Sequence, residues 1–234
     1  MHVVSELYST LLADRNHAVE TKLVIAGEEY GQTNIVKDSL SVYGGLYSSF
    51  GIGNCCARQI DFQIIPKGTI PRQANIQVYA RLISGDQKSE WIPKGVFFFA
   101  TRKTDRKTGV LTVHGYDAML KAEETWLDSS YDGENWPMPA ATAVADIAQR
   151  MGVTMDIRTV LDAAFPVQYP VDDEGDMTMR EALARIAVSN AGNWIITDEG
   201  KLLLVGLNSM PEETSNLLTE TGDAITFGGI RILV

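Results

Sequence analysis

The fold is decided by residues 36–116, which read VKDSLSVYGGLYSSFGIGNCCARQIDFQIIPKGTIPRQANIQVYARLISGDQKSEWIPKGVFFFATRKTDRKTGVLTVHGY. Short runs of alternating apolar and polar residues follow one another in this stretch. Turns rich in glycine, proline and aspartate separate the runs. Alternation with a period of two is typical of half-buried strands. Six or seven such strands with loops of ordinary length predict a small β-barrel or a β-sandwich.

Two of these runs show the alternation most clearly. In the first, Cys56, Ile60, Phe62 and Ile64 face one way while polar residues face the other. In the second, residues 75–82 repeat the pattern. Both runs predict strands with one buried face and one exposed face.

An apolar run without polar interruption is formed by Val96, Phe97, Phe98 and Phe99. A strand of this composition is either buried on both faces or presents an apolar patch to a partner. Aromatic side chains are enriched at subunit interfaces. We therefore take these four residues as a candidate subunit interface, with an ordinary core strand as an equally supported alternative.

The residues before this stretch predict a short helix and a hairpin. Ser5 is suited to cap a helix whose apolar residues include Leu7 and Leu11. Residues 19–25 alternate like a strand, and residues 27–29 suit the tight turn of a hairpin.

The residues after it predict two helices and another hairpin. A helix is expected at 140–151, followed by a short strand at 153–157. Thr178 begins a second helix, with Glu181 at the spacing of a capping box. Apolar runs on either side of residues 198–201 predict a hairpin.

These elements define an α+β chain in three parts. Residues 1–128 are expected to form a small β-barrel domain with a short N-terminal helix. Residues 129–208 are expected to form a small α+β module. Residues 209–234 are expected to be a linker followed by the first strand of an incomplete further barrel, which needs a partner strand to complete it.

Charge is distributed unevenly between these parts. The net charge is −10, yet residues 1–128 carry 14 basic and 14 acidic side chains, whereas residues 129–208 carry 5 basic and 12 acidic ones. Nonspecific nucleic-acid binding needs clustered Lys and Arg to displace counterions from phosphates. The distribution argues against such binding, and we expect no sequence-specific nucleic-acid binding either.

The remaining bulk features concern location and cofactors. The N-terminus has no signal-peptide pattern, and no apolar run approaches the roughly 20 residues that span a bilayer. Cys55 and Cys56 are adjacent, a pairing that would strain a disulfide, which indicates a reducing compartment. His2, His17 and His114 are too scattered to complete a zinc site. We expect no metal and no cofactor.

Two loops could be taken for ligand sites. Residues 50–54, Phe-Gly-Ile-Gly-Asn, lack the spacing of a phosphate-binding loop, and no helix follows them, so a structural turn is favoured. Residues 172–176, Asp-Asp-Glu-Gly-Asp, could bind a hard cation but lack the pattern of a calcium loop. A solvated loop at the start of a helix is favoured there.

Catalytic and carbohydrate-binding patterns are weak. No two carboxylates are paired as glycoside hydrolysis requires. His114 lies in a strand pattern, where a core or edge histidine is the default. Trp126, Trp136 and Trp194 could form a ligand platform, but we expect Trp194 in the core and the other two at the joint between the domains.

The order of these motifs resembles a known family. The motifs are GLYSSFGIGN at 45–54, KGVFFF at 94–99, LTVHGYDAM at 111–119, TMREALARIA at 178–187 and GNWIITDEGKL at 192–202. Together they resemble the baseplate-hub and tail-associated proteins of tailed bacteriophages and prophages. The resemblance covers roughly residues 1–230 and rests on strands, turns and helices rather than on catalytic signatures.

The resemblance implies a structural protein without enzymatic activity. It implies a tail-tube-like barrel with a small inserted module, three copies of which form a ring at the tip of the tail tube. The partners would be further copies and the tube, spike and baseplate proteins. The protein would be assembled in the cytoplasm of the host bacterium and located in the virion tail. A cell-wall glycan or peptide hydrolase, or a carbohydrate-binding module, is the alternative.

Overall fold

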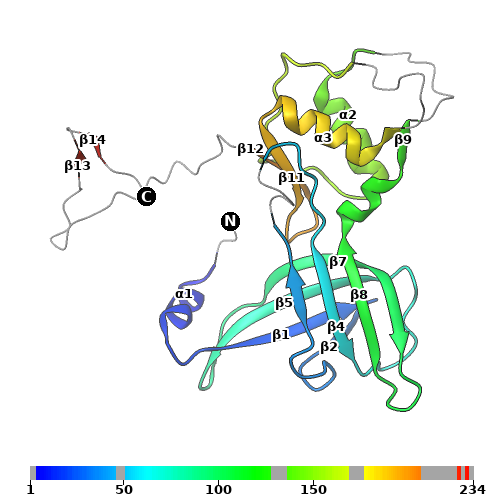
Figure 1. The fold of residues 1–234 in the computed structure, drawn as a ribbon. Helices are drawn as coiled ribbons and strands as arrows, with labels where there is room; N and C mark the ends of the chain where they lie inside the picture. Colours follow the sequence, from blue (N-terminus) through cyan, green and yellow to red (C-terminus); the bar gives the residue numbers. More distant parts are fainter. Residues whose placement is uncertain are drawn as a thin grey trace.

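The structure is a computed structural model that describes residues 4–45, 51–127, 136–168 and 177–206, together with the backbone of two short strands at 226–227 and 230–231. It has a mixed α/β fold that consists mostly of sheet (Figure 1). A strongly curved sheet forms the lower part of the view, and a module of two helices and short strands lies on top of it. Among the described helices none is both long and apolar enough to cross a bilayer.

The elements follow one another along the chain. They are α1 (Glu6–Ala13), β1 (Ala18–Ile25), β2 (Glu28–Tyr30), β3 (Ser41–Tyr43), β4 (Gln59–Ile64), β5 (Asn75–Ser84), β6 (Gln87–Lys88), β7 (Ile92–Thr104), β8 (Leu111–Asp117), the 3-10 helix η1 (Ala118–Glu123), β9 (Thr125–Leu127), α2 (Ala140–Met151), β10 (Met177–Thr178), α3 (Met179–Ser189), β11 (Gly192–Ile196), β12 (Leu202–Gly206), β13 (Thr226–Phe227) and β14 (Ile230–Arg231).

The large sheet is antiparallel and has the order β2-β1-β5-β7-β8-β4-β3, with β6 paired to β5. The alternation that predicted its strands is confirmed except at Cys56, which precedes β4 and is half-buried, whereas Cys55 is buried. Ile60, Phe62 and Ile64 of β4 are all buried, as are Ile76 and Val78 of β5. The polar residues between them face outward, so one face of the sheet encloses an apolar cluster.

The sheet curves back toward itself. Leu23 of β1 and Tyr30 of β2 share a buried cluster with Ile60 of β4, although β2 and β4 lie near opposite ends of the strand order. After β2 the chain returns to the edge of β4, where Ile35 forms an antiparallel bridge with Ile64. No pairing joins the end strands β2 and β3 among the described residues, so a closed barrel is not detected.

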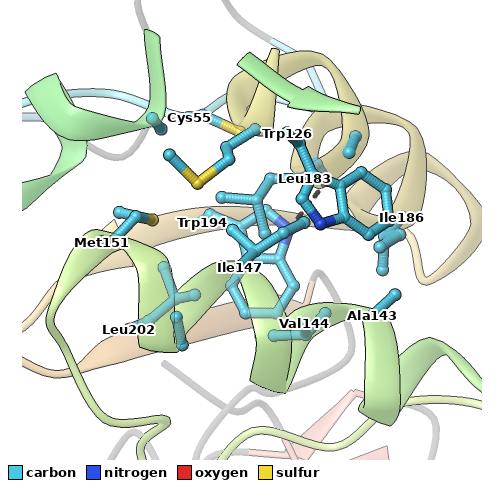
Figure 2. Packing of buried hydrophobic residues seen from close by; sticks show 14 of the residues in the cluster. Cys55, Trp126, Ala143, Val144, Ile147, Met151, Leu183, Ile186, Trp194 and Leu202 are labelled. Atoms are coloured by element: carbon cyan, nitrogen blue, oxygen red, sulfur yellow. Dashed lines mark hydrogen bonds between the residues drawn. The ribbon is translucent and has the colours of Figure 1, made fainter. Parts of the chain in front are cut away.

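The upper module packs α2 and α3 against the antiparallel hairpin β11–β12. The helix predicted at 140–151 is confirmed to the residue. The capping box predicted for α3 is also confirmed, since Thr178 Oγ1 accepts from the backbone of Glu181 and the Glu181 carboxylate accepts from the backbone of Thr178. Trp194 lies fully buried at the centre of the cluster, among side chains of both helices (Figure 2).

The sequence prediction differs from the structure at two places. Residues 153–157 do not form a strand, because the chain turns at Asp156 after a single parallel bridge between Met155 and Leu202. Residues 224–234, expected to begin one strand, contain the short antiparallel pair β13–β14. The acidic run at 172–176 lies outside the described residues.

Candidate functional site: the joint between sheet and module

The apolar run on β7 lies where the sheet meets the module. Successive residues on a strand point to opposite faces. Phe97 is therefore fully buried in the cluster of the sheet, with Phe99 half-buried beside it, while Phe98 packs against the cluster of the module. The run is apolar on both sides because both sides of β7 are covered here. The proposed interface at Val96–Phe99 stays a prediction, and Phe97 has no exposed surface to offer a partner.

Arg58 ties three elements together at the joint. Its Nη1 donates to Asp198 Oδ1 at 2.5 Å, in the turn of the β11–β12 hairpin. Its Nη2 donates to the carbonyl oxygen of Lys94 on β7 at 2.7 Å. The guanidinium carbon also lies 5.6 Å from the ring centroid of Phe97. A planar guanidinium can satisfy such divergent acceptors at once, which a lysine cannot do.

Asp117 is a buried carboxylate at the point where the chain leaves the sheet. It ends β8 and caps η1, and it is only 2% exposed. Its Oδ1 accepts from the Met119 backbone N–H and its Oδ2 from that of Arg58, both at 3.0 Å. Burial raises the pKa of Asp117 to about 6, although these two bonds and the positive charges of Arg58 and Arg180 act to lower it.

Arg180 of α3 makes the corresponding contacts from the module. It donates to the carbonyl oxygens of Cys55 and, at 3.2 Å, of Met119. Its Nε lies 2.5 Å from Glu123 Oε1. Burial raises the pKa of the Cys55 thiol to about 12, so this cysteine is a packing residue rather than a nucleophile.

Residues 53–54, between β3 and β4, are paired with the hairpin of the module. Gly53 N–H donates to Gly192 O at 2.9 Å, and Trp194 N–H donates to Asn54 O at 2.8 Å. The buried Asn193 accepts from Asn54 N–H through its Oδ1 at 2.8 Å. These backbone N–H groups are occupied within the chain, as expected of a structural turn rather than a phosphate-binding loop.

A cleft of about 690 Å³ opens beside this joint. It is lined by Gly44, Gly45, Arg58, residues 156–158, residues 195–199, Lys201 and Leu203. The size falls within the range of small-molecule sites. Whether the cleft could act as an active site therefore depends on the charged side chains that line it.

The charges in the cleft are matched in pairs. Arg158 donates to both carboxylate oxygens of Asp156 at 2.8 Å, and this holds the pKa of Asp156 well below its usual range. Lys201 pairs with Glu199 at 3.0 Å, in addition to the Arg58 pair with Asp198. Among the described residues each basic side chain in the cleft thus has an acidic partner. Such pairs hold loops in place, whereas a general acid needs a raised pKa.

The other candidate residues are separated from this joint. His114 pairs with Asp61 at 2.8 Å across β8 and β4, and within the described part of the chain no Ser or Thr hydroxyl hydrogen-bonds to it. Nor do the described residues contain a group of three side chains placed to hold a metal ion.

The tryptophans do not form an exposed platform. Trp194 is in the core, as predicted, and its Nε1 donates to Leu183 O at 2.8 Å (Figure 2). Trp126 is buried, donates to Asp146 of α2 at 2.6 Å, and meets Trp136 edge to face at 5.8 Å. Trp126 is a buried member of the module's cluster and Trp136 packs against that cluster, so both lie in the module, although they were expected at the joint between the domains.

Arg58, Asp117 and Arg180 are not among the site residues that the sequence predicts. An aspartate that ends an alternating strand just before a helical turn is a recognisable N-cap signal, so Asp117 could have been found. Arg58 and Arg180 give no local signal, because their partners lie 36 to 140 positions away.

The comparisons with known proteins concern the fold. No family model matches the sequence, and a search of curated proteins finds no match. Among solved structures, the chain is similar to the 43 kDa tail protein of prophage MuSo2 from Shewanella oneidensis, with 15% identity and a TM-score of 0.50 over 82% of this chain and 56% of that chain.

Two further structures are less similar. One is the tail protein from Neisseria meningitidis MC58, with 13% identity and a TM-score of 0.49 over 80% of this chain and 50% of that one. The other is prophage tail protein gp18 from Listeria monocytogenes EGD-e, with 11% identity and a TM-score of 0.43 over 85% and 55%. The chain spans about half the length of these neighbours. All three are tail proteins, and the similarity to the MuSo2 protein is one of fold.

Proposed function

We propose that this chain is a structural component of a phage or prophage tail tip, forming a hub ring that joins the tail tube to the distal spike or baseplate. The observation that carries the proposal is the similarity in fold to the MuSo2 tail protein over 82% of the chain. The joint between sheet and module supports a structural role, because its charged groups are paired with one another and the Cys55 thiol is buried. The chain would have no enzymatic activity of its own.

The ring would consist of three copies. The curved sheet is the part we take as tail-tube-like and barrel-like, and its end strands β2 and β3 have backbone groups that a neighbouring copy could pair with. The run Val96–Phe99 remains the candidate subunit interface, with Val96, Phe98 and Phe99 as the members that keep some exposed surface. The partners would be the tube, spike and baseplate proteins in the virion tail, after assembly in the host cytoplasm.

Immunogold electron microscopy tests the location. Antibodies raised against the purified chain should label purified tails at one end only, the tip distal to the head. Label distributed along the tube, or confined to the head, would overturn the proposal. Purified cell wall incubated with the chain should release no soluble fragments, and release of fragments would favour a hydrolase instead.

A further inference from the structure

The end of the sheet opposite the module is a basic surface, which we call the basic end. It consists of the β7–β8 turn and the loop between β4 and β5, and its basic residues are Lys67, Arg72, Arg102, Lys103, Arg106 and Lys107. Lys67 Nζ donates to Glu29 O, so the acidic β1–β2 turn borders this surface on one side. Residues 101–109 alone contain four basic side chains and one acidic one, and all nine residues are exposed. This concentration stands out in a chain with a net charge of −10.

The fold makes the β7–β8 turn project and holds it in place. β5 pairs with β7 only as far as Phe98, whereas the pairing of β8 with β7 continues as far as Thr104. The last residues of β7 therefore have a partner strand on one side only. Arg102 crosses to the neighbouring loop, where its Nη1 donates to Ile70 O at 2.8 Å while its guanidinium carbon lies 5.9 Å from the Phe99 ring centroid. This contact places the loop that carries Lys67 and Arg72 beside the turn.

The turn itself is ordered by hydrogen bonds. Asp105 Oδ1 accepts from Lys107 N–H at 2.8 Å, a bond that lowers the pKa of Asp105. Gly109 N–H donates to Asp105 O at 2.8 Å. A preformed surface loses less conformational entropy on binding than a mobile one does.

The outward basic groups have no ion-pair partner in the part of the chain that the structure describes. Among the described residues, Arg72, Lys103, Arg106 and Lys107 form no salt bridge, whereas Lys22, Arg58, Arg81 and Arg158 each form one. Clustered cations repel one another, so an anionic partner would be attracted to this end.

The charge of the rest of the chain favours one kind of partner. Attraction between exposed charges extends over about 8 Å at physiological ionic strength. A long polyanion such as DNA would extend past the basic end onto the rest of the chain, whose net charge is negative. A compact acidic surface could touch the basic end alone.

We propose that the basic end binds an acidic surface of another protein, through Lys103, Arg106 and Lys107 of the β7–β8 turn with Arg72 beside them. The proposal does not depend on a role in a hub ring, since it rests on the charges and geometry of this end. Rim charges of this kind chiefly set the rate and orientation of association.

Fluorescence anisotropy with a labelled short glutamate peptide as the compact acidic probe tests the proposal, with a short unlabelled DNA duplex as competitor. The test variant combines Lys103→Glu, Arg106→Glu and Lys107→Glu. Its matched control combines Arg15→Glu, Lys37→Glu and Lys88→Glu, which are exposed and change the net charge equally. Circular dichroism confirms that both variants fold.

The expected result is salt-dependent binding by the unmodified chain that weakens about tenfold or more in the test variant and about twofold or less in the control. Equal weakening in both variants would show a general effect of net charge and overturn the proposal. It would also be overturned if the unmodified chain failed to bind the probe, or if the duplex bound more tightly than the glutamate peptide.

Discussion

Asp117 is a buried carboxylate at the point where the chain passes from the sheet to the module. Its pKa is raised from the usual 3.8 to about 6 by burial. The folded protein therefore binds a proton at Asp117 at a pH where the unfolded chain does not. Stability contributed by this group rises as pH falls from about 6 toward 3.8, which is the reverse of the usual carboxylate.

We expect Asp117→Asn to remove this dependence while keeping an acceptor oxygen for one of the two backbone N–H groups that Asp117 binds, those of Met119 and Arg58. A shift of about two pKa units corresponds to about 3 kcal/mol. The unfolding free energy of the unmodified protein, relative to that of the variant, should thus increase by up to about 3 kcal/mol between pH 7 and pH 4. Urea unfolding at a series of pH values measures this difference.

Asp14→Asn is the matched control. Hydrogen bonds, first that from Ser84, lower the pKa of Asp14, so its contribution is present above the usual carboxylate pKa and is lost only as pH falls below it. The unfolding free energy of the unmodified protein, relative to that of Asp14→Asn, should therefore not rise between pH 7 and pH 5. If the difference in unfolding free energy between the unmodified protein and Asp117→Asn were also independent of pH, the pKa of Asp117 would not be raised in the folded protein.

Gly115 of β8 is required by close packing. A Cβ at this position would lie 2.5 Å from the carbonyl oxygen of Phe98 and 3.2 Å from Ile60 Cγ2. Gly115→Ala should lower the unfolding free energy by about 1–3 kcal/mol, the usual cost of overpacking. Gly68→Ala, where a Cβ meets nothing within 4 Å, should change it little. Equal midpoints in chemical denaturation for the two variants would contradict the register of β7 and β8.

For single residues, the sequence predicts which side chains are buried better than it predicts what they pack against. Trp194 and the β4 residues are placed correctly, because apolar residues at fixed periods must face a core. The run Val96–Phe99 shows the limit. Its composition predicts cover on both faces, yet nothing local says whether the cover on the Phe98 side is a partner subunit or the chain's own module.

Among the elements, α3 is one whose start the sequence predicts down to the capping box. The Thr178 hydroxyl and the Glu181 carboxylate satisfy each other's backbone N–H groups at 3.2 and 2.9 Å. We expect Thr178→Ala to lower the unfolding free energy by about 1 kcal/mol, since it leaves a helix N–H unsatisfied. Thr178→Ser keeps the hydroxyl and should retain most of the stability in thermal or urea unfolding. If Thr178→Ser lowered the unfolding free energy as much as Thr178→Ala, the loss could not be attributed to the capping hydroxyl.

Elements made by long-range pairing are the ones that sequence patterns miss. The strands β9 and β10 are three and two residues long and pair across about 50 positions of sequence, too short for an alternation to be visible. The pairing of residues 53–54 with β11 is likewise absent from any local pattern. The first pairing lies within the module, and the second joins the module to the segment before β4, so the joint could not be predicted although both of its halves were.

For the whole molecule, the sequence predicts a β-rich first part and a small helical second part, and the structure has both. Closure of the sheet is a property of hydrogen bonding between its ends. Patterns of alternation fix which residues face inward but leave open which edges pair. The division of the chain at 128 also stays a prediction, since residues 118–127 pack with the helices of the module.

The most direct test of the central proposal is cryo-electron microscopy of intact tails that contain this chain. We predict three copies arranged around the tail axis at the tip, with the curved sheets side by side between the tube and the distal spike or baseplate. Tails in which the chain is absent from the tip, or is present there as a single copy off the axis, would contradict the account.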